Sequence, residues 1–261
     1  MKHCRKEPGE PQCLSAFRAK NPAAEWERDF RGTGEGRACY ETLRSTLRQA
    51  PTGLCAYCEI RLTPGNEQIA HFHPKSDRSS NHNWALDWDN LWIGCLGGTR
   101  VADRQIDSDG KPKYPLPGNR SCDEATTDSV LDGVILRPDE VPPFPRLFRF
   151  LQSPDRLDIA PDAAACTAAG IPVERVEATI EKLNLNCRRL AEARLPLHRQ
   201  LEYAKKRLRE SGADPGAGLR RLAEAHLAID PDGCRKAFFT VARWSLHRYA
   251  EDHLRETQFC R

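Results

Sequence analysis

The chain has 261 residues, of which 39% are hydrophobic and 30% are charged, with 40 Lys and Arg residues against 37 Asp and Glu residues. This length suits one large domain or two modest domains with buried cores. The mean hydropathy of −0.66 and the lack of a long apolar run exclude a transmembrane helix, and the net charge of +3 does not by itself indicate nucleic-acid binding.

The N-terminal sequence MKHCRKEPGEPQ is charged and has no apolar stretch, so it predicts no secretory signal. The chain contains eleven cysteines, an odd number. Without an export signal, a disulfide framework is not expected, and metal binding or buried thiols are favoured. We therefore expect a cytoplasmic protein that makes no contact with a membrane.

Two elements are predicted in the first third of the chain. Tyr40, Leu43 and Leu47 recur at helical spacing, which predicts a helix over 40–48. The short run 68–73 follows a Pro-Gly-Asn turn and predicts a strand, which ends where a proline removes the next backbone donor.

The remainder is predicted to be a long loop followed by helices. Residues 97–121 are rich in Gly, Asp and Pro, which is typical of a functional or disordered loop. From Pro172 onward, apolar residues recur at steps of three and four, as on one face of a helix. This stripe consists of Val173, Val176, Ile180, Leu183 and Cys187. Further helices are expected over 188–211, 216–228 and 233–257.

Four cysteines are candidates for a tetrahedral metal site. Cys55 and Cys58 have the C-x2-C spacing of a zinc knuckle, and structural zinc commonly takes its ligands as two such pairs. Cys95 and Cys122 could supply the second pair, although 26 residues separate them. The alternative that these two are ordinary buried thiols stays open at this point.

Two histidines lie in the predicted strand. His71 and His73 are two residues apart, so their side chains are expected on one face. A neutral imidazole can take a proton from water or bind a metal, although two surface histidines beside a turn would show the same spacing. Asn90 lies between the cysteine pairs, and Asp123 directly follows Cys122. A base, an amide and a carboxylate framed by candidate zinc ligands favour a functional site.

Several motifs follow the order found in HNH (ββα-metal) endonucleases. GLCAYCEIRL is followed by IAHFHPKS and then by LDWDNLWIGC. The chain resembles more specifically the HNH nuclease subunit of Septu-type and retron-associated antiviral defence systems, known as PtuB. ILRPDEVPPFPRLFRF and VEATIEKLNLNCRRLAEAR extend the resemblance over most of residues 40–194.

The resemblance implies an α+β protein that is mostly α-helical. Its ββα-metal core, at 50–135, would contain a structural zinc. A helical or irregular segment at 1–49 would precede this core, and a helical region at 136–261 would follow it and dock a partner.

The resemblance also implies roles for individual residues. His71 would be the general base that activates water, and Asn90 would brace the loop that aims His71 or contribute to the metal site. Asp123 would bind a catalytic Mg²⁺ or Mn²⁺ ion, which stabilises the scissile phosphate. The structural zinc ligands would be Cys55, Cys58, Cys95 and Cys122. Lys75 and Arg78 are candidates for phosphate contacts because they directly follow the catalytic strand.

Ala70 is the main departure from the family pattern. The family places an acidic metal ligand directly before the catalytic histidine, where this chain has an alanine without any oxygen ligand. The metal could be held otherwise, with His73 as a substitute, or the chain could be inactive, whether naturally or through an engineered substitution. The insertion before Cys122 and the pair Thr126-Thr127, in place of a frequent lysine, are further departures.

The sequence thus predicts a metal-dependent endonuclease that cuts DNA or tRNA as the effector of an antiviral defence system. By the resemblance alone, a partner ABC- or SMC-like ATPase, PtuA-like, would regulate it. Two alternatives stay open: an inactive zinc-knuckle adaptor that binds nucleic acid, which Ala70 favours, and a stand-alone restriction-type enzyme. The basic stretch 188–209 is either a solvated helix face or a phosphate-binding surface.

Overall fold

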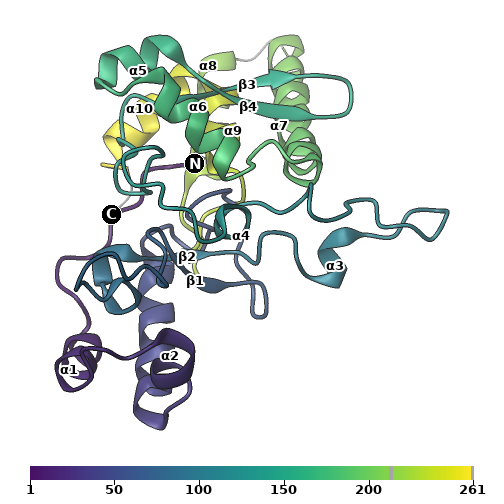
Figure 1. Cartoon of the computed structure of the whole chain (residues 1–261). Helices are drawn as coiled ribbons and strands as arrows, with labels where there is room; N and C mark the ends of the chain where they lie inside the picture. Colours follow the sequence, from purple (N-terminus) through teal and green to yellow (C-terminus); the bar gives the residue numbers. More distant parts are fainter. Residues whose placement is uncertain (212–213, 260–261) are drawn as a thin grey trace.

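The computed structural model describes residues 1–211 and 214–259. Helices dominate, and two separate antiparallel sheets of two strands lie among them (Figure 1). The first sheet pairs β1 (Gln68–His71) with β2 (Leu91–Gly94), and the second pairs β3 (Phe148–Gln152) with β4 (Leu157–Pro161). The predicted class, α+β and mostly helical, agrees with this arrangement.

Two helices precede the first sheet. Helix α1 (Gln12–Lys20) and helix α2 (Gly34–Gln49) pack against each other, and a short π-helix, η1 (Trp26–Phe30), connects them. A disulfide joins Cys13 to Cys39 with a Cα–Cα distance of 5.5 Å. Sequence reasoning disfavoured a disulfide framework because no export signal was found. It missed this disulfide because the cysteine count does not show which cysteines helix packing brings within bonding distance.

Helix α2 includes the predicted helix at 40–48 and begins earlier. Thr33 caps its N-terminus, where the hydroxyl oxygen accepts a hydrogen bond from the N–H of Gly36. Its buried face includes Tyr40, Leu43 and Leu47, as predicted, and the helix packs against both strands of the first sheet. Two short 3-10 helices, Trp84–Leu86 and Trp88–Asn90, lead into β2.

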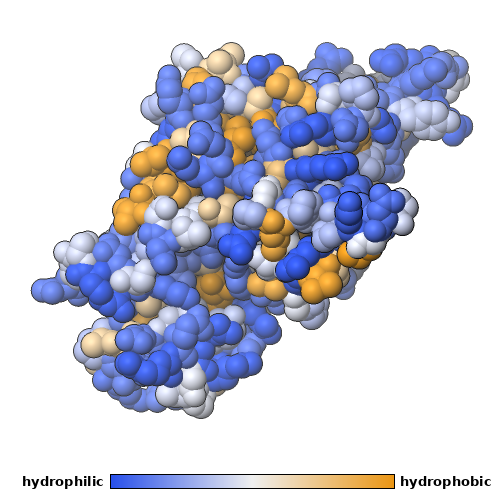
Figure 2. Space-filling model, turned by 45° about the vertical axis from the view of Figure 1, so that its right-hand side comes forward, coloured by the Kyte–Doolittle hydropathy of each residue, from blue (hydrophilic) through white to orange (hydrophobic). Residues whose placement is uncertain are grey.

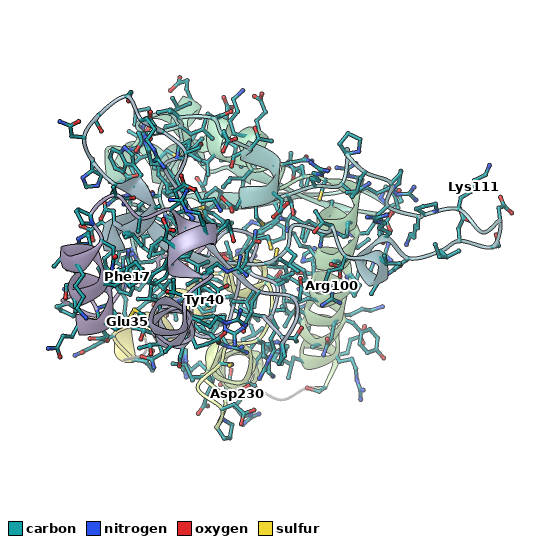
Figure 3. The ribbon with its side chains drawn as sticks, turned by 60° about the horizontal axis from the view of Figure 1, so that its bottom comes forward. Phe17, Glu35, Tyr40, Arg100, Lys111 and Asp230 are labelled. Carbon is teal, nitrogen blue, oxygen red and sulfur yellow. A yellow bond between two sulfur atoms is a disulfide. The ribbon has the colours of Figure 1, made fainter. Side chains whose placement is uncertain are left out.

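The predicted loop at 97–121 contains one helical turn, α3 (Val101–Arg104). This segment extends away from the body of the molecule (Figure 1), and Lys111 lies at its far end (Figure 3). The chain returns to the interior at Ser121 and Cys122, which are fully buried. The short helix α4 (Asp123–Thr126) follows directly.

The described residues of the C-terminal half contain the second sheet and six helices. They are α5 (Ala163–Ala169), α6 (Val173–Lys182), α7 (Arg188–Glu210), α8 (Pro215–Leu227), α9 (Phe239–Leu246) and α10 (Arg248–Glu256). The predicted helices at 188–211 and 216–228 correspond to α7 and α8. The hairpin of β3 and β4 was not predicted, because the prolines around it obscure the alternation of its strands.

Two predicted helical stretches are interrupted. Helix α6 ends at Lys182, so Leu183 and Cys187 lie in a bend where Asn184 has a φ of +46°. The predicted helix at 233–257 begins only at Phe239 and breaks at His247, whose φ is +49°. Apolar spacing continued across these points, but a left-handed backbone conformation stops a helix regardless of the side-chain pattern.

The buried apolar residues form two clusters. The larger extends from the N-terminal helices through the first sheet to α6 and the start of α7, and the smaller lies among α7, α8, α9 and α10. On the face drawn in Figure 2, hydrophilic residues predominate and the apolar residues form small patches. Among the described helices, none has the length and apolar character needed to cross a membrane.

Candidate functional site

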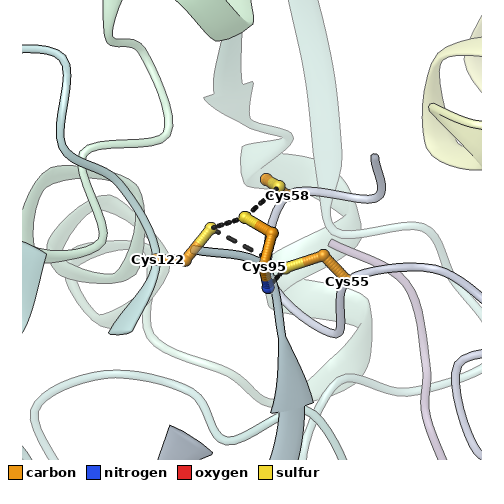
Figure 4. A group of neighbouring side chains, drawn as sticks. All are labelled: Cys55, Cys58, Cys95 and Cys122. Atoms are coloured by element: carbon orange, nitrogen blue, oxygen red, sulfur yellow. Dashed lines mark hydrogen bonds between the residues drawn. The ribbon is translucent and has the colours of Figure 1, made fainter. Parts of the chain in front are cut away.

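Four cysteines from three segments meet in the interior (Figure 4). Cys55 and Cys58 lie in the turn after α2, Cys95 directly follows β2, and Cys122 directly precedes α4. The Sγ–Sγ distance is 3.8 Å for Cys55 and Cys122, 3.7 Å for Cys58 and Cys95, and 3.8 Å for Cys95 and Cys122. All four sulfur atoms lie within 4.8 Å of one another.

This geometry fits a tetrahedral metal ion. Zinc–sulfur bonds of about 2.3 Å at tetrahedral angles place the sulfur atoms about 3.8 Å apart. The N–H groups of Cys95 and Gly97 lie 3.4 Å from the sulfur atoms of Cys55 and Cys95, where they can stabilise thiolates. The four cysteines together can therefore hold a structural metal, and the second pair is not simply two isolated buried thiols.

The four thiols of the cluster influence one another's ionisation. Burial opposes ionisation of Cys55, but hydrogen bonds from the three neighbouring thiols hold its pKa well below the ordinary value. Burial raises the pKa of Cys122 well above its ordinary value, and the hydrogen bond with Cys55 raises it further. The protein alone thus favours the thiolate at Cys55 and opposes it at Cys122, whereas a cation at the centre would allow all four sulfurs to ionise.

His71 is held in one orientation at the end of β1. Its Nε2 lies 3.2 Å from the carbonyl oxygen of Ala85, so the tautomer that donates this hydrogen bond keeps a lone pair on Nδ1. The ring also packs edge-to-face on Trp26, with 4.5 Å between the centroids. Burial lowers the pKa of His71 to about 3, so the ring is neutral at pH 7. A neutral imidazole with a free nitrogen can accept a proton from water.

A cavity of about 400 Å³ lies beside His71. Three acidic residues on and after α4 line it, namely Asp123, Glu124 and Asp128. Burial and the charge of Glu124 raise the pKa of Asp123 to about 7. The side-chain amide of Gln68 in β1 donates to Glu124 at 2.8 Å and so ties α4 to the first sheet. The structure thus brings His71 and Asp123, both predicted site residues, to the same cavity.

His73 has different surroundings. Its Nδ1 lies 2.7 Å from Asp132 and its Nε2 lies 2.7 Å from Asp77, and the ring stacks on Trp84. His73 does not line the cavity. Strand β1 ends at His71, two residues before the predicted end, so the alternation that predicted a shared face does not extend to His73.

Asn90 forms hydrogen bonds with the backbone of two segments near the candidate site. Its Oδ1 accepts from the N–H of His73 at 2.6 Å. Its Nδ2 donates to the carbonyl oxygens of His73 at 2.9 Å and Trp84 at 2.8 Å. The buried amide thus joins the segment after β1 to the segment before β2, an arrangement that favours bracing over metal binding.

The other predicted site residues are divided between the cavity and its surroundings. Ala70 is fully buried and does not line the cavity. Lys75 lines it and forms an ion pair of 2.8 Å with Glu27. Arg78 is exposed, donates to the backbone carbonyls of Lys75 and Asp77, and lies outside the lining.

Sequence reasoning missed several residues of the cavity. Glu27, Arg31 and Arg120 line it, and Trp26 forms part of its wall. No motif or spacing marks these positions. They line the cavity because the segment between α1 and α2 lies beside His71, where Trp26 contacts its ring, and because the long loop returns directly before α4.

The amino-acid sequence is 34% identical over 208 residues to an Escherichia coli protein described as "Retron Ec83 putative HNH endonuclease". The aligned region covers 72% of this chain and 76% of that protein. No family model matches the chain. With this identity and coverage, the chain belongs to the HNH endonucleases. Its relative is a retron protein, which confirms the predicted resemblance to the retron-associated members.

Proposed function

We propose that this protein is a metal-dependent endonuclease that hydrolyses phosphodiester bonds of nucleic acid as the effector of an antiviral defence system. The observation that carries the proposal is the convergence of His71 and Asp123 on one cavity in a chain of the HNH family. We assign β1, β2 and α4 to the ββα-metal core. Two facts support this assignment: β1 pairs with β2, and Gln68 in β1 bonds to Glu124 in α4.

In this mechanism, Nδ1 of His71 takes a proton from the water that attacks the phosphorus atom. The hydrogen bond from Nε2 to Ala85 fixes the ring while the proton moves to Nδ1. Asp123 would hold Mg²⁺ or Mn²⁺, and Glu124 and Asp128 supply further carboxylate oxygens in place of the acid missing at Ala70. Such an ion supplies positive charge that stabilises the scissile phosphate and the leaving oxygen.

We propose that the four-cysteine cluster would hold a structural zinc that fixes the segments of the candidate active site. It joins the turn after α2, the end of β2 and the start of α4. Because Asp123 directly follows Cys122, fixing the Cys122 sulfur also fixes the first residue of α4. A closed thiolate site would thus provide rigidity, and the carboxylate-lined cavity would provide the chemistry.

Replacing Asp123 with asparagine should lower the cleavage rate about 100-fold, by analogy with the loss of one electrostatic stabiliser. Asparagine keeps the size of the side chain but removes its negative charge. The measurement is the initial cleavage rate as a function of Mn²⁺ concentration. Asp109→Asn, in the exposed part of the long loop, is the matched control and should behave like the wild type. Equal rates for the two variants would contradict the role of Asp123.

At saturating Mn²⁺, the cleavage rate should change little between about pH 8 and about pH 6. An ordinary histidine, with a pKa of about 6.5, would be roughly three-quarters protonated at pH 6. Burial lowers the pKa of His71 to about 3, so the neutral base persists over this range. Saturating metal competes with the proton on Asp123 and keeps that carboxylate ionised. An acidic limb in the pH–rate profile with a midpoint near 6.5 would contradict this account.

The inactive adaptor is a second candidate, and Ala70 is the observation that favours it. An Ala70→Glu variant separates the two. This variant places a carboxylate at a fully buried position in the first sheet, so it should be destabilised by several kcal/mol unless a bound metal ion pairs with that carboxylate. Thermal unfolding and cleavage are measured together. A silent wild type and a cutting Ala70→Glu variant would establish the adaptor.

We also propose that a partner ATPase of the ABC or SMC-like type regulates the nuclease by docking on the region 136–261. The resemblance to the defence nucleases supports this proposal, and so does the retron named for the relative. Co-purification with the co-encoded ATPase, followed by a cleavage assay with and without ATP, is the test. Cleavage that is independent of any partner would favour the stand-alone enzyme.

A further inference from the structure

The cavity beside His71 contains a carboxylate that binds two cations at once. Glu27, in η1, accepts a hydrogen bond from Nζ of Lys75 on Oε1 at 2.8 Å. Its Oε2 accepts from Nη1 of Arg31 at 2.7 Å. The three side chains line the same cavity as His71. The two oxygens of one carboxylate thus occupy the positions that two non-bridging oxygens of a phosphodiester could take.

Donors without an acceptor remain in the same lining. The guanidinium of Arg120 forms no ion pair or hydrogen bond with any residue in the described part of the chain, and its side chain is exposed. Nε of Arg31 is buried and likewise has no acceptor among the described residues. A buried donor without a partner is costly, and an anion bound in the cavity would supply an acceptor.

The remaining acidic side chains of the cavity do not compete for these donors. Glu67 is bound by Arg48 at 2.8 Å. Glu124 accepts from Gln68, and the carboxylates on and after α4 are the ones proposed to hold the metal. The cavity therefore combines carboxylates for a cation with three basic side chains for an anion, as a phosphodiester bound to a metal requires.

We propose that Arg31, Lys75 and Arg120 form a phosphate-binding site for the nucleic-acid backbone, and that Glu27 occupies this site as a phosphate mimic when no substrate is bound. The inference rests on the proposed nuclease function and adds the residues that bind the backbone phosphates of its substrate. An incoming phosphate replaces the Glu27 carboxylate on Lys75 and Arg31 and takes the free donors of Arg31 and Arg120.

The local structure allows this exchange without disturbing the catalytic histidine. The side chain of Glu27 is 58% exposed, so it can turn into solvent. Its neighbour Trp26 is only 4% exposed and packs on the ring of His71. Movement of Glu27 therefore opens the phosphate site, while Trp26 keeps His71 in place.

The test is nucleic-acid binding measured by fluorescence anisotropy in a His71→Ala background, in which cleavage is expected to be slow. The probes are a labelled DNA duplex and a labelled tRNA, titrated over a range of salt concentrations. Glu27→Gln should tighten binding about fivefold, because it removes one negative charge close to the bound phosphate. Arg120→Gln should weaken binding and reduce the slope of log K against log salt by about 0.9, the loss of one phosphate contact.

The matched controls come from the same π-helix region. Glu25 and Arg28 pair with each other at 3.4 Å, are exposed, and do not line the cavity. Glu25→Gln and Arg28→Gln should leave both the affinity and the salt slope unchanged.

The possible results separate this inference from the proposed function. If the wild-type chain cuts nucleic acid but Glu27→Gln binds no more tightly than Glu25→Gln, the phosphate mimic is overturned and the nuclease stands. An Arg120→Gln variant with an unchanged salt slope would likewise overturn the proposed site. If neither polymer binds to any variant, both the site and the nuclease function fail.

Discussion

Replacing His71 with alanine is expected to lower the rate of nucleic-acid cleavage about 1,000-fold, within the range for loss of a general base. The substitution removes Nδ1, the nitrogen that accepts the proton of the attacking water. It leaves the acidic residues of the cavity and the four cysteines in place, so the metal content should remain close to that of the wild type. Single-turnover cleavage with Mn²⁺ measures the effect.

His82→Ala is the matched control for this substitution. His82 is exposed, pairs with Asp87 at 2.9 Å, and does not line the cavity. Its loss should leave the cleavage rate within about twofold of the wild type, as for a surface change away from the site. A His71→Ala variant that cuts as fast as His82→Ala would remove His71 from the mechanism.

Replacing Cys122 with serine is expected to cause the largest loss of stability. The purified wild-type chain should contain one zinc per molecule, and the variant should lose it. Because structural zinc contributes free energy directly to folding, the loss should amount to several kcal/mol and unfold the region around α4. Elemental analysis and thermal unfolding measure the two effects. Cleavage should disappear as well, because Asp123 directly follows Cys122.

Cys166→Ser provides the comparison for a buried thiol outside the cluster. Cys166 is fully buried in α5 and lies near the backbone carbonyl of Leu147. This variant should retain the zinc and lose only about 1 kcal/mol of stability, as for a modest polar change in a core. Normal metal content and stability in Cys122→Ser would mean that the cluster is four buried thiols.

The parts of the fold that could be predicted from the sequence are those with local signals. Tyr40, Leu43 and Leu47 mark the buried face of α2 by their spacing, and the basic stretch at 188–209 forms most of the long helix α7. The breaks at Asn184 and His247 could not be predicted, because neither residue is a glycine or a proline. Tertiary packing there imposes a backbone conformation that the local sequence does not signal.

The candidate site shows the same limit. The C-x2-C motif marked Cys55 and Cys58, which lie in the four-cysteine cluster, and the family pattern marked His71 and Asp123, which line one cavity. The spacing predicted a shared strand face for His71 and His73, but His73 is bound by Asp77 and Asp132 outside the cavity.

The contribution of the N-terminal segment was missed for a different reason. Glu27 lies 48 residues before its partner Lys75 in the sequence, and the π-helix that contains it packs against α2. The disulfide between Cys13 and Cys39 depends on the packing of α1 against α2. A sequence pattern reports neighbours within one element, and it does not report which distant elements meet.

The most direct test of the account is a cleavage assay on the purified wild-type chain, with its zinc retained and without other divalent ions, before and after addition of Mg²⁺ or Mn²⁺. Supercoiled DNA and tRNA serve as substrates, with the co-encoded ATPase present in a parallel series. The account predicts cleavage of at least one polymer only after the divalent ion is added. If nothing is cut under any of these conditions while zinc content and nucleic-acid binding remain intact, the protein is a binding adaptor and not a nuclease.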